Sequence, residues 1–449
     1  MKWLMWTLLV PAALSAQAVD TTTPRAAVDT SRSIAMDTTA RPIALDEAVR
    51  LAQRNAPAAV QARGQLRSGR AGIRSSYFAF VPNISLSAGS TRQAGDRFDP
   101  VRDEVVSGQT TWQYGDGYNL NLTLFDGGRR IFDIGAARAN FRAAEANEVT
   151  QEFTVALDVK REYYNVLAAR ESEAAAAAQL EQAEQQLRAA SARVMAGVAT
   201  RSDSLRSVIQ VGNARLALLT ARNNYNAANA ALTRLVATPF VVTAMPEDTL
   251  QRVVLDVDSV RLADLAENGP AVRQAQAQHA AARAGERAAR TPYLPTISAN
   301  YNWGRSASAS SLEIGGDPLI KSNSLRLSVS FPVFDQFQRE EAVVRASVAE
   351  DNARAALRDA RLASQQQLIQ FVGSLRTAEE RVGIQTASVA AAEEDLRVQS
   401  QRYAVGASTL LDVLTSQTQL NQARSDLIQA RYDYRIAKAQ IEALIGRTL

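Results

Sequence analysis

The fold is decided by a stretch that the sequence contains twice, Arg193-Val-Met-Ala-Gly-Val-Ala-Thr-Arg-Ser-Asp203 and Arg402-Tyr-Ala-Val-Gly-Ala-Ser-Thr-Leu-Leu-Asp412. Arg, Gly, Thr and Asp keep the same spacing in both copies, at a constant offset of 209 residues. Further identical pairs at this offset are Leu205 and Leu414, Gln210 and Gln419, Tyr225 and Tyr434, and Phe125 and Phe334. A repeat this long is a duplicated half-molecule, because solenoid units have only about 20 to 50 residues.

Each copy of the stretch joins two long helical segments. From Arg129 to about Ala196 there is no Pro and only Gly135, and one helix of that length would span about 100 Å. Gly197 is a typical C-terminal stop with positive φ, and Thr200 or Ser202 can cap a second helix. The pattern therefore predicts a helical hairpin over about 129–237, and the repeat predicts a second over about 337–445.

The return helices carry a seam of residues spaced alternately three and four apart. In the second half large and small residues alternate along it, as in Val413, Ser416, Leu420, Ala423 and Leu427. This spacing is typical of knobs-into-holes packing. We expect these residues to build the wall of a helical assembly and to take no part in chemistry.

Four shorter segments, at about 82–91, 117–126, 295–304 and 324–334, alternate between apolar and polar residues. In one of them Leu120, Leu122 and Leu124 oppose Asn119 and Asn121. Period-two alternation predicts strands. Strands of this length with one apolar face fit a transmembrane barrel. Aromatic residues available for its interfacial girdles are Tyr118, Tyr301 and Trp303.

Four strands are too few to close such a barrel, and open strand edges are not tolerated in lipid. Two copies of the chain would give eight strands, whose interior is filled by side chains. Three copies would give 12 strands and a conducting lumen. The predicted fold is therefore mainly α with a transmembrane β part, a trimeric 12-stranded β-barrel continuous with a long coiled-coil α-helical barrel.

The chain ends and the junction complete the predicted organisation. Residues 1–18 read as a secretory signal peptide, with Lys2, an apolar run and a small-x-small site at Ala16-Gln17-Ala18. A flexible segment, 19–42, precedes the first repeat at 43–237. A Pro-bearing connector, 238–258, separates it from the second repeat at 259–446. The sequence contains no Cys, so disulfides are excluded.

In these motifs the chain resembles the TolC-type outer membrane factors, from about Leu45 to Gly446. Besides the two turn stretches, the resemblance is carried by Leu45-Asp46-Glu47-Ala48, Ala430-Arg431-Tyr432-x-Tyr434 and Ala443-Leu444-Ile445-Gly446. It implies a homotrimer in outer membrane lipid, with the α-helical barrel in the periplasm. It also implies two protein partners, a periplasmic adaptor and an inner membrane RND or ABC transporter. The implied function is the exit duct of a tripartite efflux or type I secretion system.

The resemblance also assigns roles to the turns at the helical tips. It places an adaptor-binding tip at Arg193, Gly197, Val198, Arg402, Gly406 and Ala407. It places a periplasmic gate at Asp203 and Asp412, with Tyr403 beside them. The usual Arg and second Asp of the family gate are replaced by Ser408 and Thr415, so Arg201 is the nearest replacement cation. The alternative is that both aspartates only serve the first turn of their helices.

Other classes of function find little support in the sequence. The net charge of +4 comes from scattered arginines without a dense basic run, so no nucleic-acid partner is expected. The single histidine, His279, lies in an Ala-rich segment, and no Gly-x-Ser-x-Gly elbow occurs. We therefore expect no enzyme activity, cofactor or metal site. A periplasmic coiled-coil scaffold without a pore remains the alternative, although it would leave the four apolar strand faces unused.

Overall fold

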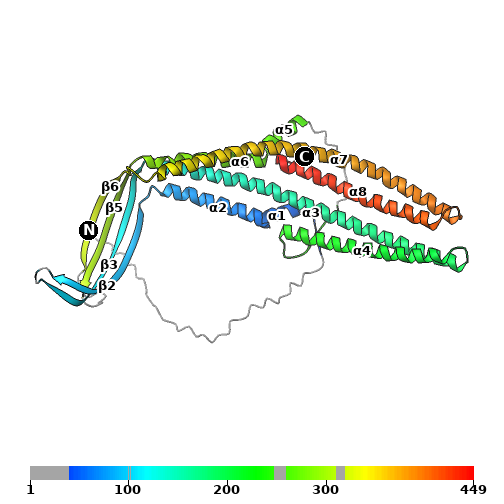
Figure 1. Ribbon diagram of the computed structural model, residues 1–449, viewed down its shortest axis with the longest axis horizontal. Coiled ribbons are helices and arrows are strands. Elements are labelled where there is room, and N and C mark those ends of the chain that lie inside the picture. The colour runs from blue at the N-terminus through cyan, green and yellow to red at the C-terminus, as the bar shows by residue number, and fades with distance from the viewer. Residues whose placement is uncertain (1–39, 100, 102, 247–258, 310–318, 449) are drawn as a thin grey trace, which may run out of the picture.

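The computed structural model describes residues 40–99, 101, 103–246, 259–309 and 319–448. The molecule is elongated, with a sheet at one end and long helices that run to the other end (Figure 1). The expected signal peptide lies outside the described residues, as do most of the expected flexible segment and the second part of the connector. No helix among the described residues is long and apolar enough to cross a membrane.

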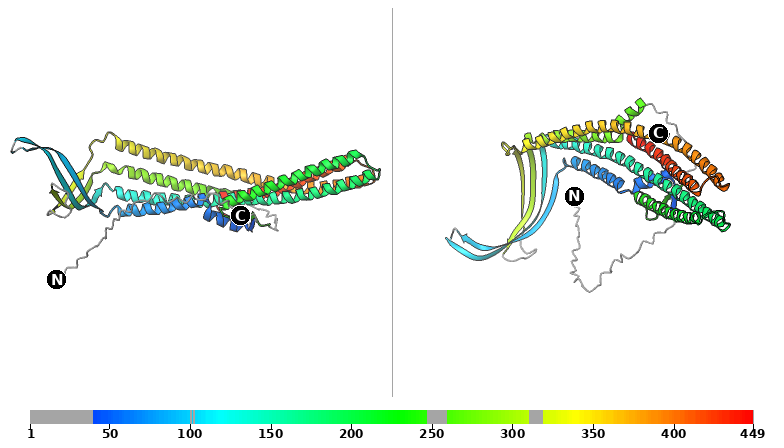
Figure 2. Two further views of the ribbon diagram at one scale, coloured as in Figure 1. Left: turned by 90° about the horizontal axis from the view of Figure 1, so that it is seen from below. Right: turned by 45° about the vertical axis from the view of Figure 1, so that its right-hand side comes forward.

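The two halves of the chain build the same series of helices. The first half contains α1 (Leu45–Asn55), α2 (Pro57–Phe78), α3 (Arg129–Met195) and α4 (Arg201–Val236). The second half contains α5 (Ser259–Glu267), α6 (Pro270–Ala289), α7 (Gln338–Ala404) and α8 (Leu410–Ile445). Helices α3 and α7 both have 67 residues, and α4 and α8 both have 36. The hairpins α3–α4 and α7–α8 turn at the same end of the molecule, as all views show (Figures 1 and 2).

The expected seam is buried in both hairpins. Ser207 and Ala214 of α4 are 1% and 0% exposed, and Val413 and Leu420 of α8 are 6% and 3% exposed. Small side chains at these positions let the antiparallel helices approach closely. The second half of α8 also packs on α3, where Lys160 Nζ lies 2.5 Å from Glu442 Oε2.

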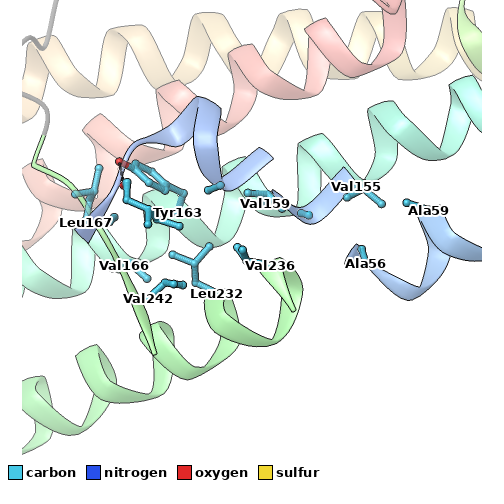
Figure 3. Close-up of a cluster of buried hydrophobic side chains, with 14 of the residues drawn as sticks. Ala56, Ala59, Val155, Val159, Tyr163, Val166, Leu167, Leu232, Val236 and Val242 are labelled. Atoms are coloured by element: carbon cyan, nitrogen blue, oxygen red, sulfur yellow. Dashed lines mark hydrogen bonds between the residues drawn. The ribbon is translucent and has the colours of Figure 1, made fainter. Parts of the chain in front are cut away.

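A compact core lies near the middle of the length, where α1, α3, α4 and two short strands meet (Figure 3). Strand β1 (Arg41–Ile43) pairs in parallel with β4 (Val242–Ala244). The fully buried Tyr163 of α3 places its hydroxyl 3.1 Å from the carbonyl oxygens of both Ile43 and Met245. Residues 41 and 42, which we expected in a flexible segment, are therefore ordered by pairing that depends on residues two hundred positions away.

The sheet at the other end is antiparallel, in the order β2-β3-β5-β6. Its strands are β2 (Asn83–Asp99), β3 (Glu104–Asp126), β5 (Thr296–Ala309) and β6 (Ile320–Ser330). The first two extend beyond their predicted ends near 91 and 117, because β2 and β3 stay paired as far as Asp99 and Glu104. Apolar alternation marks only a buried or lipid-facing part of a strand, whereas backbone pairing continues without it.

The register separates the side chains of the sheet onto two faces. One row across the four strands contains Ile84, Leu120, Tyr301 and Leu325, and the next row along contains Ser85, Asn119, Asn302 and Ser324. Apolar residues on the first face are largely exposed in the single chain, with Leu86 at 84% and Leu327 at 68%. A face of this kind fits lipid, and the polar face fits a water-filled lumen.

We expect the β2–β3 tip to be outside the cell and the helical tips to be in the periplasm. Val101 is 92% exposed at the first end and Val405 is 80% exposed at the other. Because the chain has no cysteine, Val101→Cys should react with an impermeant thiol reagent on intact cells. Val405→Cys should react only after the outer membrane is opened. The reverse labelling pattern would contradict this orientation.

Candidate functional site at the helical tips

Both tips are closed by the same backbone turn. Gly197 and Gly406 have φ values of 71° and 75°, a left-handed conformation that side-chain-bearing residues rarely adopt. The Val198 amide donates to the Arg193 carbonyl at 3.0 Å, and the Ala407 amide donates to the Arg402 carbonyl at 2.8 Å. These are Schellman turns, which satisfy carbonyl groups at a helix end and reverse the chain tightly.

The two predicted gate carboxylates lie in capping boxes directly after these turns. Asp203 Oδ2 accepts hydrogen bonds from the amide and hydroxyl of Thr200, at 3.1 and 2.8 Å. Asp412 Oδ2 accepts the same pair from Thr409, both at 2.8 Å. In return each Thr hydroxyl oxygen accepts from the Asp amide. The reciprocal pattern begins α4 and α8 and satisfies donors that a helix start leaves free.

The hydrogen bonds also affect the charge on Asp412. The amide and hydroxyl of Thr409, helped by the nearby Arg402 guanidinium, lower the pKa of Asp412 below its usual value. A depressed folded-state pKa means that the ionised carboxylate stabilises the cap above its unfolded-state pKa. This contribution is lost as the pH falls through the folded-state pKa. Asp412 is therefore a charged cap at neutral pH.

A direct link joins the two hairpins of one chain at the tips. The Arg193 guanidinium at the end of α3 lies 4.7 Å from the ring centroid of Tyr403 at the end of α7. It also donates to the carbonyl oxygens of Tyr403 and Ala404, at 3.5 and 3.2 Å. A cation over an aromatic ring and at a helix C-terminus is favourable in both respects. Arg193 therefore links the C-terminal ends of α3 and α7.

The remaining predicted residues are not brought into this link. Arg402 donates to the Ala407 carbonyl within its own turn, at 3.4 Å. Arg201 is exposed, and in the part of the chain that the structure describes no hydrogen bond joins it to Asp203 or Asp412. Val198 is 74% exposed and Ala407 is also exposed at the tip surface. The single chain thus presents these groups to solvent or to another molecule.

Sequence reasoning missed two features of the tips. Met195 and Val405 are 83% and 80% exposed beside the turns, so each tip ends in an apolar side chain that is nearly free of contacts. The Arg193–Tyr403 link was also missed, because the two residues lie 210 positions apart and only the pairing of the hairpins brings them together. The capping boxes, in contrast, can be predicted from the sequence, because each contains the Thr-x-x-Asp spacing.

Comparisons with known proteins agree with this architecture. The family model described as outer membrane efflux protein matches residues 48–238 and 262–447. Protein CyaE of Bordetella pertussis is 29% identical over 409 residues, which cover 88% of this chain and 81% of CyaE. The outer membrane protein TolC of Escherichia coli is 24% identical over 392 residues, which cover 81% of this chain and 79% of TolC.

A solved structure shows the same fold. The open state of the MtrE outer membrane channel of Neisseria gonorrhoeae superposes with a TM-score of 0.69 at 20% identity, covering 90% of this chain and 89% of that one. Because the family model matches both halves, the chain belongs to the outer membrane efflux protein family. It is an exit duct of the outer membrane with a large periplasmic helical part, and it is not an enzyme.

We expect Arg193→Ala to loosen the two tips relative to each other. Loss of this half-buried, charge-assisted contact should lower the local free energy of opening by about 1 kcal/mol, which corresponds to roughly a fivefold increase in the rate of amide exchange. Hydrogen exchange followed by mass spectrometry should detect this in peptides covering 194–200 and 403–409. Arg188→Ala is the matched control, since Arg188 is an exposed arginine of the same helix. Equal effects of the two variants would show that the link does not hold the tips.

Proposed function

We propose that three copies of this chain form the duct. The observation that carries this proposal is the sheet, whose edge strands β2 and β6 each pair with only one other strand of the described chain. Unpaired backbone groups at such edges are costly in lipid, so a closed barrel is required. Three copies supply 12 strands, enough for an open lumen, whereas eight strands leave an interior filled by side chains.

The helical part supports the same assembly through its internal repeat. Within one chain, α8 packs on α3. The repeat makes α4 the counterpart of α8 and α7 the counterpart of α3, so the same contact would form between α4 of one copy and α7 of the next. Gln417 of α8 is 1% exposed, whereas its counterpart Val208 on α4 is 52% exposed. Leu219, the α4 counterpart of Ile428 on α8, is 57% exposed. In the single chain, α4 therefore lacks the neighbour that the repeat would place against it.

We expect Leu219→Glu to prevent trimer formation, because each interface would have to bury an unpaired carboxylate. The control is Asn213→Glu on the same helix, since both Asn213 and its counterpart Gln422 are exposed. Light scattering of the purified proteins in detergent should give the mass of a trimer for the wild type and the control. Leu219→Glu should give monomers. A trimeric Leu219→Glu protein would mean that the α4 face lies outside the interface.

The helical tips are the proposed docking surface for a periplasmic adaptor, which in turn connects the duct to an inner membrane RND or ABC transporter. The exposed Met195, Val198 and Val405 support this proposal, because apolar side chains at the end of a periplasmic structure favour contact with a protein partner. Gly197, Gly406, Ala407 and Arg402 would form the rest of this surface. Substrates would then pass through the duct passively.

The same tips are the proposed gate. In a ring of three chains, Asp203 and Asp412 would contribute six carboxylates around the narrow end of the helical barrel. Such a ring attracts cations and repels anions. Tyr403, held by Arg193, would narrow the entrance, and Arg201 would be free to reach a carboxylate of the next copy. Each aspartate would then both cap its helix and place a negative charge at the pore entrance.

The charge and the cap can be separated by substitution. Asp203→Asn with Asp412→Asn removes the charge but keeps a side-chain oxygen that can accept the Thr hydrogen bonds. Thr200→Ala with Thr409→Ala removes the caps, at about 1 kcal/mol each, but keeps the charge. In planar bilayers the Asn pair should lower cation selectivity and raise conductance, while the Ala pair should retain the selectivity. Wild-type selectivity in the Asn pair would restrict both aspartates to capping.

A further inference from the structure

The lipid-facing side of the sheet carries two cations side by side. The register pairs Arg305 of β5 directly with Lys321 of β6, and Asp116 of β3 lies on the other side of Arg305 in the same row. Like charges directly opposite each other on neighbouring strands are destabilising. This row has one carboxylate for two cations, so its own side chains leave one positive charge unbalanced.

The geometry of the ion pair leaves part of Arg305 available. Its Nη2 lies 2.8 Å from Asp116 Oδ2, and its Nε lies 3.2 Å from both carboxylate oxygens. Nη1 takes no part in these bonds. Asp116 therefore fixes the orientation of the guanidinium, while Lys321 is exposed beside it. Among the described residues, the ion pairs include no carboxylate partner for Lys321.

The level of this row in the membrane is set by the aromatic residues next to it. Tyr118 and Trp303 form the adjacent row on the same face, with ring centroids 5.2 Å apart. Below them, toward the helical end of β6, the face is apolar at Leu325, Leu327 and Val329, which are all exposed. Aromatic girdles mark the membrane interface, and the apolar band between them is about 25 Å tall. The charged row thus lies just beyond the girdle that is distant from the periplasm.

The surface is hollowed at this level. A cavity of about 360 Å³ is lined by Leu86, Ala88, Asp116, Tyr118 and Trp303 of the lipid-facing side, together with Ser87 and Gly117. At Gly117 an added Cβ would lie 2.6 Å from the Trp303 carbonyl oxygen. The strands can approach this closely only because glycine occupies the position. The hollow lies on the β2–β3 side of Arg305, because its lining includes Asp116, which binds Arg305, and Trp303 of the adjacent row.

We propose that Arg305 and Lys321 bind the phosphorylated headgroup of a lipid in the outer leaflet, with the adjacent hollow and the Tyr118–Trp303 stack contacting its apolar part. Arg305 Nη1 and Lys321 Nζ supply the donors, and the phosphate balances the extra positive charge of the row. The site requires only the placement of the sheet in the outer membrane. It does not depend on the gate or on the identity of the pump.

The test compares charges on the two faces of β6. Lys321→Gln removes a cation from the lipid-facing side, and Arg326→Gln removes one from the polar side, where Arg326 pairs with Asn300. Purified protein would be titrated with diphosphoryl lipid A and with its dephosphorylated form, and bound lipid would be counted by native mass spectrometry. Lys321→Gln should weaken binding of the phosphorylated form roughly fivefold, in line with the attraction of one basic residue at a charged membrane surface.

The Arg326→Gln control should bind as the wild type does, and the dephosphorylated lipid should bind all three proteins equally weakly. Wild-type binding by Lys321→Gln, or an equal loss in Arg326→Gln, would overturn the proposal. Displacement by inorganic phosphate at the same concentration would assign the site to a free anion and not to a lipid. Bilayer conductance of Lys321→Gln should be unchanged, which separates a failure of this site from a failure of the duct.

Discussion

An antiparallel sheet of four strands with two open edges is the constraint on which the rest of this protein depends. In lipid, the unpaired amides and carbonyls of β2 and β6 have no water to bind, so one chain is an incomplete channel. The internal repeat meets this constraint in two steps. Duplication places two strand hairpins in one sheet, and assembly of copies would join the remaining edges. The lipid-facing apolar rows and the polar rows opposite them are then consistent with a barrel around water.

The helical part extends the same repeat away from the membrane. Helices of 67 residues would not persist alone, because single helices in water depend on packing for most of their stability. Small residues at the seam, such as Ala214 and Ser416, allow the close packing that replaces a globular core. The compact core lies near the middle of the molecule. There Tyr163 contacts the carbonyl groups of Ile43 and Met245, and Lys160 pairs with Glu442. From this core the helices extend in one direction to the sheet and in the other to the tips.

The tips show how a small number of polar groups can serve two purposes. Asp203 and Asp412 are already bonded within their own turns, so a role in the pore would use charges that helix capping holds in place. Arg193 adds a contact between hairpins, whereas its repeat partner Arg402 forms no such contact among the described residues and donates to the Ala407 carbonyl of its own turn. The two hairpins are therefore equal in length and turn geometry but unequal in the contacts at their ends.

The sequence by itself determined the duplication, the helical hairpins, the four strands and the glycine turns, because each follows from local periodicity or from a local backbone requirement. It also contained the Thr-x-x-Asp spacing of both caps. Only the tertiary structure decided the length of β2 and β3, the pairing of β1 with β4, the contact of Arg193 with Tyr403, and the pairing of Arg305 with Lys321 in the strand register. The geometry of these features depends on strand register and helix packing, which local patterns do not specify.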